Sequence, residues 1–429
     1  MRLSQSGLTD AAFDLLVQDS DAPARDISEG ARVSEPRNFL RHATALSMTK
    51  VADGLIDPKL VLSWLMGVLG APAALVGLLV PVREAGALLP QLFTAPRIRA
   101  MGRRKWAWVA GSAGQGVAAL AILAAALTLS GAAAGALIVA ALAVLAVARS
   151  VASVSYKDVL GKTVDKARRG TATGLAGSVA AAGVLVFAVL LMSGAVDRLL
   201  LVFLAIGLAG ALWLLAAAVF STIEEEHDPA EPGGGVGLSQ IALLWRDRGL
   251  GHFVMARILL LPTALAPPYL VLLAGQAGDD RFGALGAMVL ASSLAGFASS
   301  FVWGRLADRS SRLVLACAGA VAALFLAGAV VLDAMGTMGT VWAAPAMLFG
   351  LMVAYQGVRL GRSTYLVDMA PSENRAVYTA VANTTVGVAL LAAGAFGALA
   401  SVAGPAATLA VFAAVALAGA ALALALREV

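Results

Sequence analysis

A succession of about twelve apolar segments, most of them long enough to span a bilayer, dominates this chain of 429 residues. An α-helix needs about 20 apolar residues to cross the hydrocarbon core, and lipid offers no water to an open backbone. The long runs of Ala, Leu, Val and Gly lack the two-residue alternation of barrel strands. Only 13% of the residues are charged, against about a quarter in soluble domains. The sequence therefore predicts an all-α polytopic membrane protein.

A long polar interruption divides the apolar segments into two groups of six. It carries Glu224, Pro232 and a run of three glycines, a composition that predicts a flexible linker. We place the segments at 39–68, 71–95, 106–129, 132–153, 171–193, 199–220, 249–275, 283–303, 313–333, 340–358, 377–401 and 404–426. The predicted organisation is a tail at 1–38, an amino-terminal half at 39–220, a linker at 221–248 and a carboxy-terminal half at 249–429.

Basic residues gather in every second loop between the predicted segments. These loops hold Arg97, Arg99, Arg103, Arg104, Lys105, Lys157, Lys162, Lys166, Arg168, Arg169, Arg246, Arg248, Arg305, Arg309, Arg312, Arg359, Arg362 and Arg375. The opposite loops hold chiefly Lys59, Arg198 and Arg281, and Asp57 with Lys59 around Pro58 predicts a helix end at the outer surface. By the positive-inside rule both termini are cytoplasmic. We expect a multi-pass protein of the cell membrane, which in a bacterium is the inner membrane.

A shift of 206 residues relates the two halves. It carries Arg99 onto Arg305, Arg103 onto Arg309, Arg169 onto Arg375, Thr173 onto Thr379 and Ala176 onto Ala382. Agreements at separate places are hard to obtain by chance in a chain rich in Ala and Leu. The repeat predicts two pseudo-symmetric six-helix bundles that cross the membrane in the same orientation.

The loop at 304–312, Gly-Arg-Leu-Ala-Asp-Arg-Ser-Ser-Arg, resembles the Gly-x-Leu-Ala-Asp-Arg-x-Gly-Arg loop signature of the major facilitator superfamily. Helix count, parallel repeat and central linker extend the resemblance over nearly the whole chain past residue 38. It implies that charges of this loop tie the two halves together at the cytoplasmic face. The implied gating residues are Arg305, Asp308 and Arg309, with Arg99 and Arg103 in the first half. The first-half copy has Gly102 where the shift would place an acid, so we expect a one-sided gate.

Ionisable residues inside the predicted spanning segments are few and are costly in lipid, which makes them candidates for function. Lys50 lies near the middle of the first segment, with Asp53 one turn further, so the two can pair on one face. Arg83 and Glu84 lie at a similar depth in the second segment. The shift of 206 places Arg257 of the seventh segment beside Lys50.

We predict that Lys50 and Arg257 flank a central cavity and attract an anionic or zwitterionic substrate, with Tyr269 and Tyr355 in the cavity lining. This arrangement, with one cation in the first helix of each half, is similar to that of organophosphate antiporters of the superfamily, in which such cations bind the phosphate. Asp53 or Glu84, next to Arg83, is the predicted proton-coupling site, because protonation would change which ion pairs form. The alternative is that Lys50 with Asp53, and Arg83 with Glu84, only hold helix interfaces together.

The predicted function is secondary active transport of a small solute by alternating access, as a proton-coupled symporter or antiporter without a cofactor or metal. The alternatives are a drug or metabolite efflux carrier of the same fold, a channel, or a lipid flippase. A membrane enzyme is not expected, because no catalytic or nucleotide-binding motif is present. The expected partners are the solute, protons and the lipid bilayer. We expect a monomer that binds no nucleic acid, because the basic residues are dispersed between apolar runs.

Overall fold

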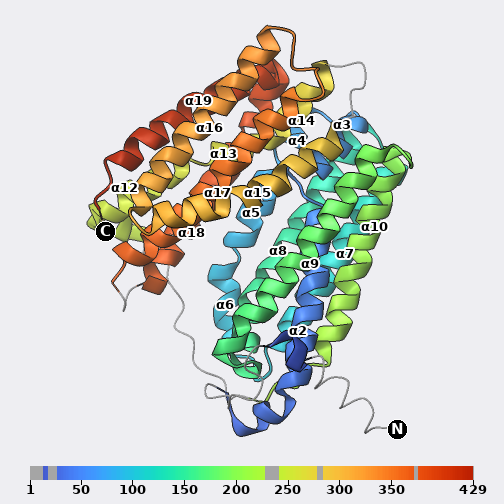
Figure 1. Cartoon of the computed structure of the whole chain (residues 1–429), viewed down its shortest axis with the longest axis vertical. Coiled ribbons are helices and arrows are strands. Elements are labelled where there is room, and N and C mark those ends of the chain that lie inside the picture. Colours follow the sequence, from blue (N-terminus) through green and yellow to red (C-terminus); the bar gives the residue numbers. More distant parts are fainter. Residues whose placement is uncertain (1–12, 18–26, 228–240, 278–283, 372–374, 429) are drawn as a thin grey trace.

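The structure, a computed structural model, describes residues 13–17, 27–227, 241–277, 284–371 and 375–428. These residues are nearly all helical (Figure 1). Within them, ten helical segments are long and apolar enough to cross a membrane, and Val377–Ala393 is a shorter apolar helix. The first predicted span is not among the ten, because its longer helix, Glu29–Leu55, carries several charged residues and its second helix, Val61–Val68, has only eight residues. The predicted all-α polytopic fold is confirmed.

The first bundle holds the helices that precede residue 222. They are α2 (Glu29–Leu55), α3 (Val61–Val68), α4 (Ala73–Val76), α5 (Leu79–Leu88), α6 (Gln91–Arg99), α7 (Lys105–Thr128), α8 (Gly131–Thr163), α9 (Lys166–Ser193) and α10 (Arg198–Ser221). Helix α2 begins before the start predicted at residue 39, because the hydroxyl of Ser28 accepts the N–H of Ala31 and caps it. Its first turns are also held by Glu35, which pairs with buried Arg168 at 2.6 Å.

The second bundle holds the helices that follow residue 242. They are α11 (Leu243–Arg246), α12 (Arg248–Leu259), α13 (Pro262–Leu265), α14 (Pro267–Ala277), α15 (Leu285–Ala307), α16 (Ser311–Ala334), α17 (Ala343–Met369), α18 (Arg375–Ala393) and α19 (Phe396–Leu424). Pro262 and Pro267 stand at the starts of α13 and α14 and divide the seventh membrane segment into three helices, since proline cannot donate a helical hydrogen bond. Gly404, at φ +86°, marks a kink inside α19 just before Pro405.

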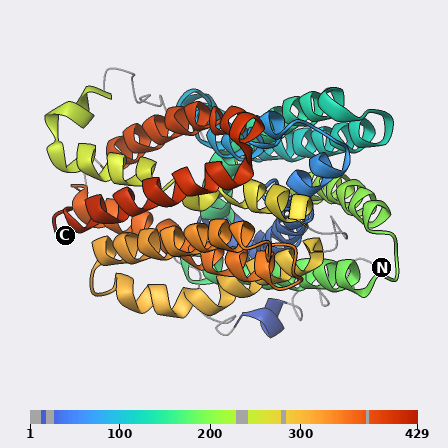
Figure 2. The ribbon, with the colours of Figure 1, turned by 90° about the horizontal axis from the view of Figure 1, so that it is seen from above.

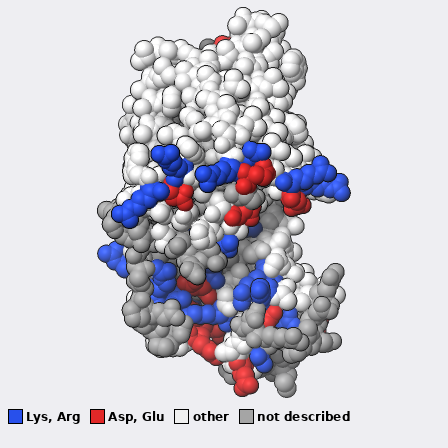
Figure 3. Space-filling view, turned by 90° about the vertical axis from the view of Figure 1, so that its left-hand side faces the viewer, with Lys and Arg blue, Asp and Glu red and all other residues white. Residues whose placement is uncertain are grey.

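The two bundles lie side by side (Figure 2) and contact each other through α5 with α18, α9 with α15, α3 with α14 and α4 with α19. They converge where α3, α4 and α14 lie and diverge toward the other end (Figure 1). We call the diverging end the basic face, because it carries the arginine-rich loops 100–104 and 308–310 together with loop 164–165. The opposite face carries loops 69–72, 194–197 and 335–342. Charged side chains gather on the lower part of the molecule, and its upper part is almost without them (Figure 3).

At the opposite face the two halves meet through backbone contacts that leave no room for side chains. A Cβ on Gly397 would lie 2.6 Å from the carbonyl oxygen of Ala74, and a Cβ on Gly77 would lie 2.5 Å from the Cα of Gly397. The N–H of Ala74 also donates to the hydroxyl of Ser401 at 2.8 Å. The α4–α19 contact therefore closes the opposite face in this conformation.

Gly397→Ala is expected to separate the halves at the opposite face, because the added methyl group meets backbone that has nowhere to move. Overpacking of this kind typically destabilises a packed contact by about 1–3 kcal/mol. Spin labels at Ala132→Cys and Val402→Cys in a Cys317→Ala background would report the separation as a longer distance distribution. Gly174→Ala is the matched control, since no atom lies within 4 Å of its added Cβ. An unchanged distribution in Gly397→Ala would contradict the proposed role of this contact.

Candidate functional site

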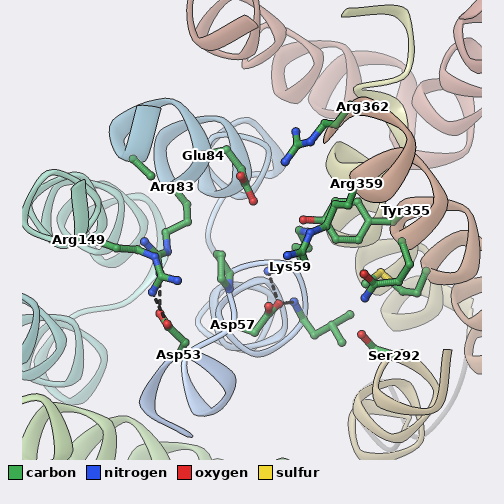
Figure 4. Close-up of a pocket in the computed structure, with 15 residues that line it drawn as sticks. Asp53, Asp57, Lys59, Arg83, Glu84, Arg149, Ser292, Tyr355, Arg359 and Arg362 are labelled. Carbon is green, nitrogen blue, oxygen red and sulfur yellow. Dashed lines mark hydrogen bonds and ion pairs between the residues drawn. The ribbon is translucent and has the colours of Figure 1, made fainter. Parts of the chain in front are cut away.

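A cavity of about 400 Å³ lies between the two halves (Figure 4). Its charged lining consists of five basic and three acidic side chains, with neutral polar groups beside them. The lining residues include Asp53, Asp57, Lys59, Arg83, Glu84, Arg149, Ser292, Tyr355, Gln356, Arg359 and Arg362. The first half contributes α2, α5, α8 and the α2–α3 junction, and the second half contributes α15 and α17.

The cavity lies at mid-depth in the helices that line it. At a rise of 1.5 Å per residue, the distance along the helix from the opposite-face end of the span is about 15 Å for Arg83, 27 Å for Arg149 and 24 Å for Arg359. Ionisable side chains at such a depth are retained where they line a polar cavity or face one another. The positions of these residues therefore fit a central binding cavity.

The break between α2 and α3 brings Lys59 into this cavity. The carboxylate of Asp57 accepts the N–H groups of Lys59 at 2.8 Å and Leu60 at 3.1 Å, which satisfies two donors that the broken helix leaves free. Lys59 is 7% exposed, and its Nζ lies 3.5 Å from the ring centroid of Tyr355 on α17. The predicted helix end at Asp57 and Lys59 is present, since α2 ends at Leu55. Its predicted place at the outer surface is wrong, because Lys59 is buried and the chain continues as the packed helix α3 to Val68.

Asp53 joins three helices of the first half. Its two carboxylate oxygens pair with Arg83 of α5, at 2.7 Å, and with Arg149 of α8. Lys50, which the sequence suggested as its partner, instead donates to the carbonyl oxygen of Thr173 on α9 at 3.1 Å. Arg149 did not stand out in the sequence, although it is a lone arginine within an apolar segment.

Helix α17 presents a row of polar side chains to the cavity. Tyr355, Arg359 and Arg362 follow one another at spacings of four and three, so they lie on one helical face. The sequence placed the two arginines in a loop after residue 358, which is wrong because α17 continues to Met369. Of the described residues, none forms an ion pair with Arg359 or Arg362. The shift of 206 carries Tyr355 onto Arg149, so equivalent positions of the two halves face the same cavity.

Glu84 of α5 points into the cavity between Lys59 and Arg362 (Figure 4). The charges of Lys59, Arg362, Arg83 and Arg149 all act on its carboxylate. Glu84 is thus an internal counter-ion that faces cations of both halves. A bound anion would compete with it for the same basic groups.

The sequence model of the Major Facilitator Superfamily matches residues 45–355. The chain belongs to this superfamily. A comparison with curated proteins finds no match. Similar solved structures include a POT family transporter in complex with 5-aminolevulinic acid, at 11% identity over 91% of this chain and 96% of that chain (TM-score 0.69). The nucleoside transporter NupG has 11% identity, with 91% and 98% coverage (TM-score 0.68).

A third similar structure is the peptide transporter POT in complex with sulfate, at 11% identity, with 91% and 94% coverage (TM-score 0.70). Identities this low show the shared fold alone. The family match, together with the shared fold, indicates a membrane transporter of the major facilitator superfamily rather than an enzyme. The resemblance carried by the 304–312 loop is confirmed.

Of the four predicted substrate residues, Tyr355 lines the cavity, and Lys50, Arg257 and Tyr269 lie outside its lining. Arg257 of α12 is 5% exposed and donates to the side-chain oxygen of Asn383 on α18 at 3.2 Å. Tyr269 of α14 is buried at the contact between the halves, with its ring edge-on to Phe412 at 5.5 Å between centroids. A Cβ on Gly77 would lie 2.5 Å from the Tyr269 hydroxyl, which places this side chain at the closed opposite face.

The predicted gating residues lie in or beside loops 100–104 and 308–310, which belong to different halves and are both at the basic face. The guanidinium of Arg305 lies 4.6 Å from the ring centroid of Phe301, and Asp308 is exposed at the end of α15. Arg309 and Arg103 are also exposed, while the carbonyl oxygen of Arg99 accepts from Arg104 at 3.1 Å. No ion pair joins the two loops among the residues that the structure describes. The gate therefore stays a prediction for a conformation in which the basic face is closed.

The first-half loop is bound to the start of the linker instead. The carboxylate of buried Glu225 accepts the N–H groups of Arg104 at 3.0 Å and Lys105 at 2.7 Å, which caps α7. The ring of His227 lies over Gly102, where a Cβ would collide with its Cε1, so a larger residue at this position would require the histidine to move. Nearby, the hydroxyl of Ser34 donates to Glu224 and lowers the pKa of that carboxyl.

Proposed function

We propose that this protein is a secondary active transporter that moves a small acidic solute across the cell membrane by alternating access. The observation that carries the proposal is the excess of basic over acidic side chains in the cavity between the halves. Arg359 and Arg362 lack ion-pair partners among the described residues. Arg359 is exposed and Arg362 is half-buried, so an anionic ligand that enters the cavity would meet positive charge on both side chains.

The proposed orientation places the basic face in the cytoplasm. The arginines and lysines of its loops favour this side by the positive-inside rule. The tail at 1–38 and the linker at 221–248 would then also lie in the cytoplasm. Because the halves pack at the opposite face and diverge at the basic face, this conformation would exchange solute with the cytoplasm. Closure of the two gate loops would complete the transport cycle.

The proposed coupling ion is the proton, with Asp53 or Glu84 as the carrier. Asp53 holds Arg83 and Arg149 together, and Glu84 faces basic groups of both halves. Protonation of either carboxylate would release cations for the solute and change which pairs join the helices. A zwitterion would use the same site if its ammonium group paired with Glu84. The charged lining does not favour an apolar drug as the substrate.

The test uses the purified full-length protein in proteoliposomes. A thermal-shift screen of organic acids, zwitterions and neutral sugars identifies stabilising compounds, and labelled forms of these are then assayed for uptake under an imposed proton gradient. We expect saturable uptake of acidic compounds, with simultaneous proton movement reported by a pH-sensitive dye inside the vesicles. Uptake of neutral sugars alone would contradict the proposal. A conductance far above carrier turnover would instead indicate a channel.

A further inference from the structure

The second half carries three basic residues within its membrane segments, Arg257, Arg359 and Arg362, and none of them forms an ion pair with a described residue. The described acidic residues of this half stand at helix ends, as Asp247, Asp308, Asp333, Asp368 and Glu428. The first half differs, since Asp53 and Glu84 face its interior cations. Positive charge that needs a counter-ion is therefore concentrated on the second half.

Arg257 is the most deeply buried of the three. Its hydrogen-bond partner is the neutral amide of Asn383, and its Nε is buried without a partner among the described atoms. Its guanidinium carbon also lies 5.6 Å from the ring centroid of Phe253. Arg362 is close enough for its positive charge to act on Arg257. A buried cation whose only hydrogen-bond partner is neutral is unfavourable, and a second cation beside it adds to the cost, so an anionic group bound at Arg362 would stabilise this region.

The basic groups define two levels within the protein. Arg362, Asn383 and Arg257 lie at about 10, 12 and 14 Å from the basic-face ends of their helices. Arg359 stands almost one turn deeper on α17, and Lys59 reaches the same region through its contact with Tyr355. The cavity thus offers one cationic position at Lys59 and Arg359 and another at Arg362 with Arg257 behind it. Their separation along α17 is about 5 Å.

We propose that the transported solute is a diacid, such as a short dicarboxylate, whose two anionic groups occupy these two positions. This inference rests on the proposed transport of acidic solutes and narrows its substrate class. One carboxylate binds between Lys59 and Arg359. The other binds Arg362, and the buried charge of Arg257 strengthens this position without direct contact. The two excess positive charges of the cavity lining match the two charges of such a solute.

The test compares diacids of three to six carbons with monoacids of the same carbon number. Binding to the full-length protein is measured by isothermal titration calorimetry in chloride-free buffer, and again with added chloride. We expect at least one diacid to bind tenfold or more tightly than its matched monoacid in both buffers. Equal binding of mono- and diacids would overturn the diacid inference and leave acid transport intact. Monoacid binding that matches the diacid only with chloride would also overturn it, because the second anion would then be inorganic.

Variants separate the two positions. Arg362→Gln and Arg257→Gln are each expected to bring the diacid preference, which is the ratio of diacid to monoacid affinity, close to one, because only the Lys59–Arg359 position then keeps its full positive charge. Arg248→Gln, an exposed arginine on the same helix as Arg257, is the matched control and should keep the preference. Arg362→Gln is the deciding variant if Arg257→Gln does not fold. A preserved preference in folded Arg362→Gln would overturn the inference. Failure of every acid to bind the wild type would contradict the proposed function itself.

Discussion

Asp53→Asn is expected to lower the free energy of unfolding by about 3 kcal/mol, the largest stability effect of a single isosteric change that we foresee in this protein. The amide keeps the shape of the carboxylate and removes the charge that Arg83 and Arg149 share. We place the value at the low end for a broken buried pair because the Arg149 side chain is 37% exposed to the cavity. Thermal or denaturant unfolding in detergent would measure it.

Two comparisons give this prediction its specificity. Asp368→Asn changes an exposed aspartate on α17 and should leave stability unchanged. Adding Arg149→Gln to Asp53→Asn removes one of the unpaired cations and should recover part of the lost stability. If Asp53→Asn unfolds like the wild type, the Arg83–Asp53–Arg149 cluster does not hold α2, α5 and α8 together.

The same variant tests the proposed coupling role. If Asp53 carries the proton, Asp53→Asn should retain solute exchange between the two sides but lose uptake driven by a proton gradient. Exchange should also become independent of pH across the range in which wild-type exchange changes. Glu84→Gln is the parallel variant. Unchanged proton coupling in both variants would remove these two carboxylates as carriers.

Lys59→Gln is expected to reduce transport of an acidic solute at least thirtyfold in kcat/KM. Loss of one partner from a desolvated charge pair typically corresponds to about 2–5 kcal/mol. The lysine is buried at the helix break and lies against Tyr355 of the other half, so its loss affects both solute binding and the contact across the cavity. Initial uptake rates at several solute concentrations would give the value.

Lys157→Gln, which changes an exposed lysine near the end of α8, provides the control and should transport normally. Tyr355→Leu separates the two roles of Lys59. It removes the cation–π contact, worth about 0.5–2 kcal/mol, and leaves the ammonium group in place. Normal kcat/KM in folded Lys59→Gln would show that this ammonium group does not contact the solute.

Several cavity residues could be predicted because charge is rare inside a membrane. Asp53, Arg83, Glu84 and Tyr355 were singled out from the sequence and line the cavity. Arg149 was not predicted, although, like Arg257, it is an arginine in an apolar segment with no acidic residue within four positions. Three further basic residues of the cavity were predicted to lie in loops: Lys59, Arg359 and Arg362.

The basic residues of α17 show why the apolar run was a poor guide to the helix end. A helix that lines a polar cavity can continue through basic residues, because those side chains face the cavity and one another instead of lipid. The spacing of Tyr355, Arg359 and Arg362 was a usable signal, since it places all three on one helical face. At Lys59 the signal was hidden, because a proline beside two charged residues is equally typical of a helix end at a surface.

The succession of apolar segments determined the fold class, because each span must satisfy its own backbone hydrogen bonds in lipid and its length is set by the bilayer. The 304–312 loop indicated the superfamily, and the shift of 206 residues indicated its internal repeat. Both were predictable because each is a pattern in the order of residues along the chain. The partners of the charges could not be read in this way. Asp53 has Lys50 as its neighbour in sequence, yet it pairs with Arg83 and Arg149 from two other helices. Only tertiary packing decides which helices bring their charges together, and so only the structure located the cavity.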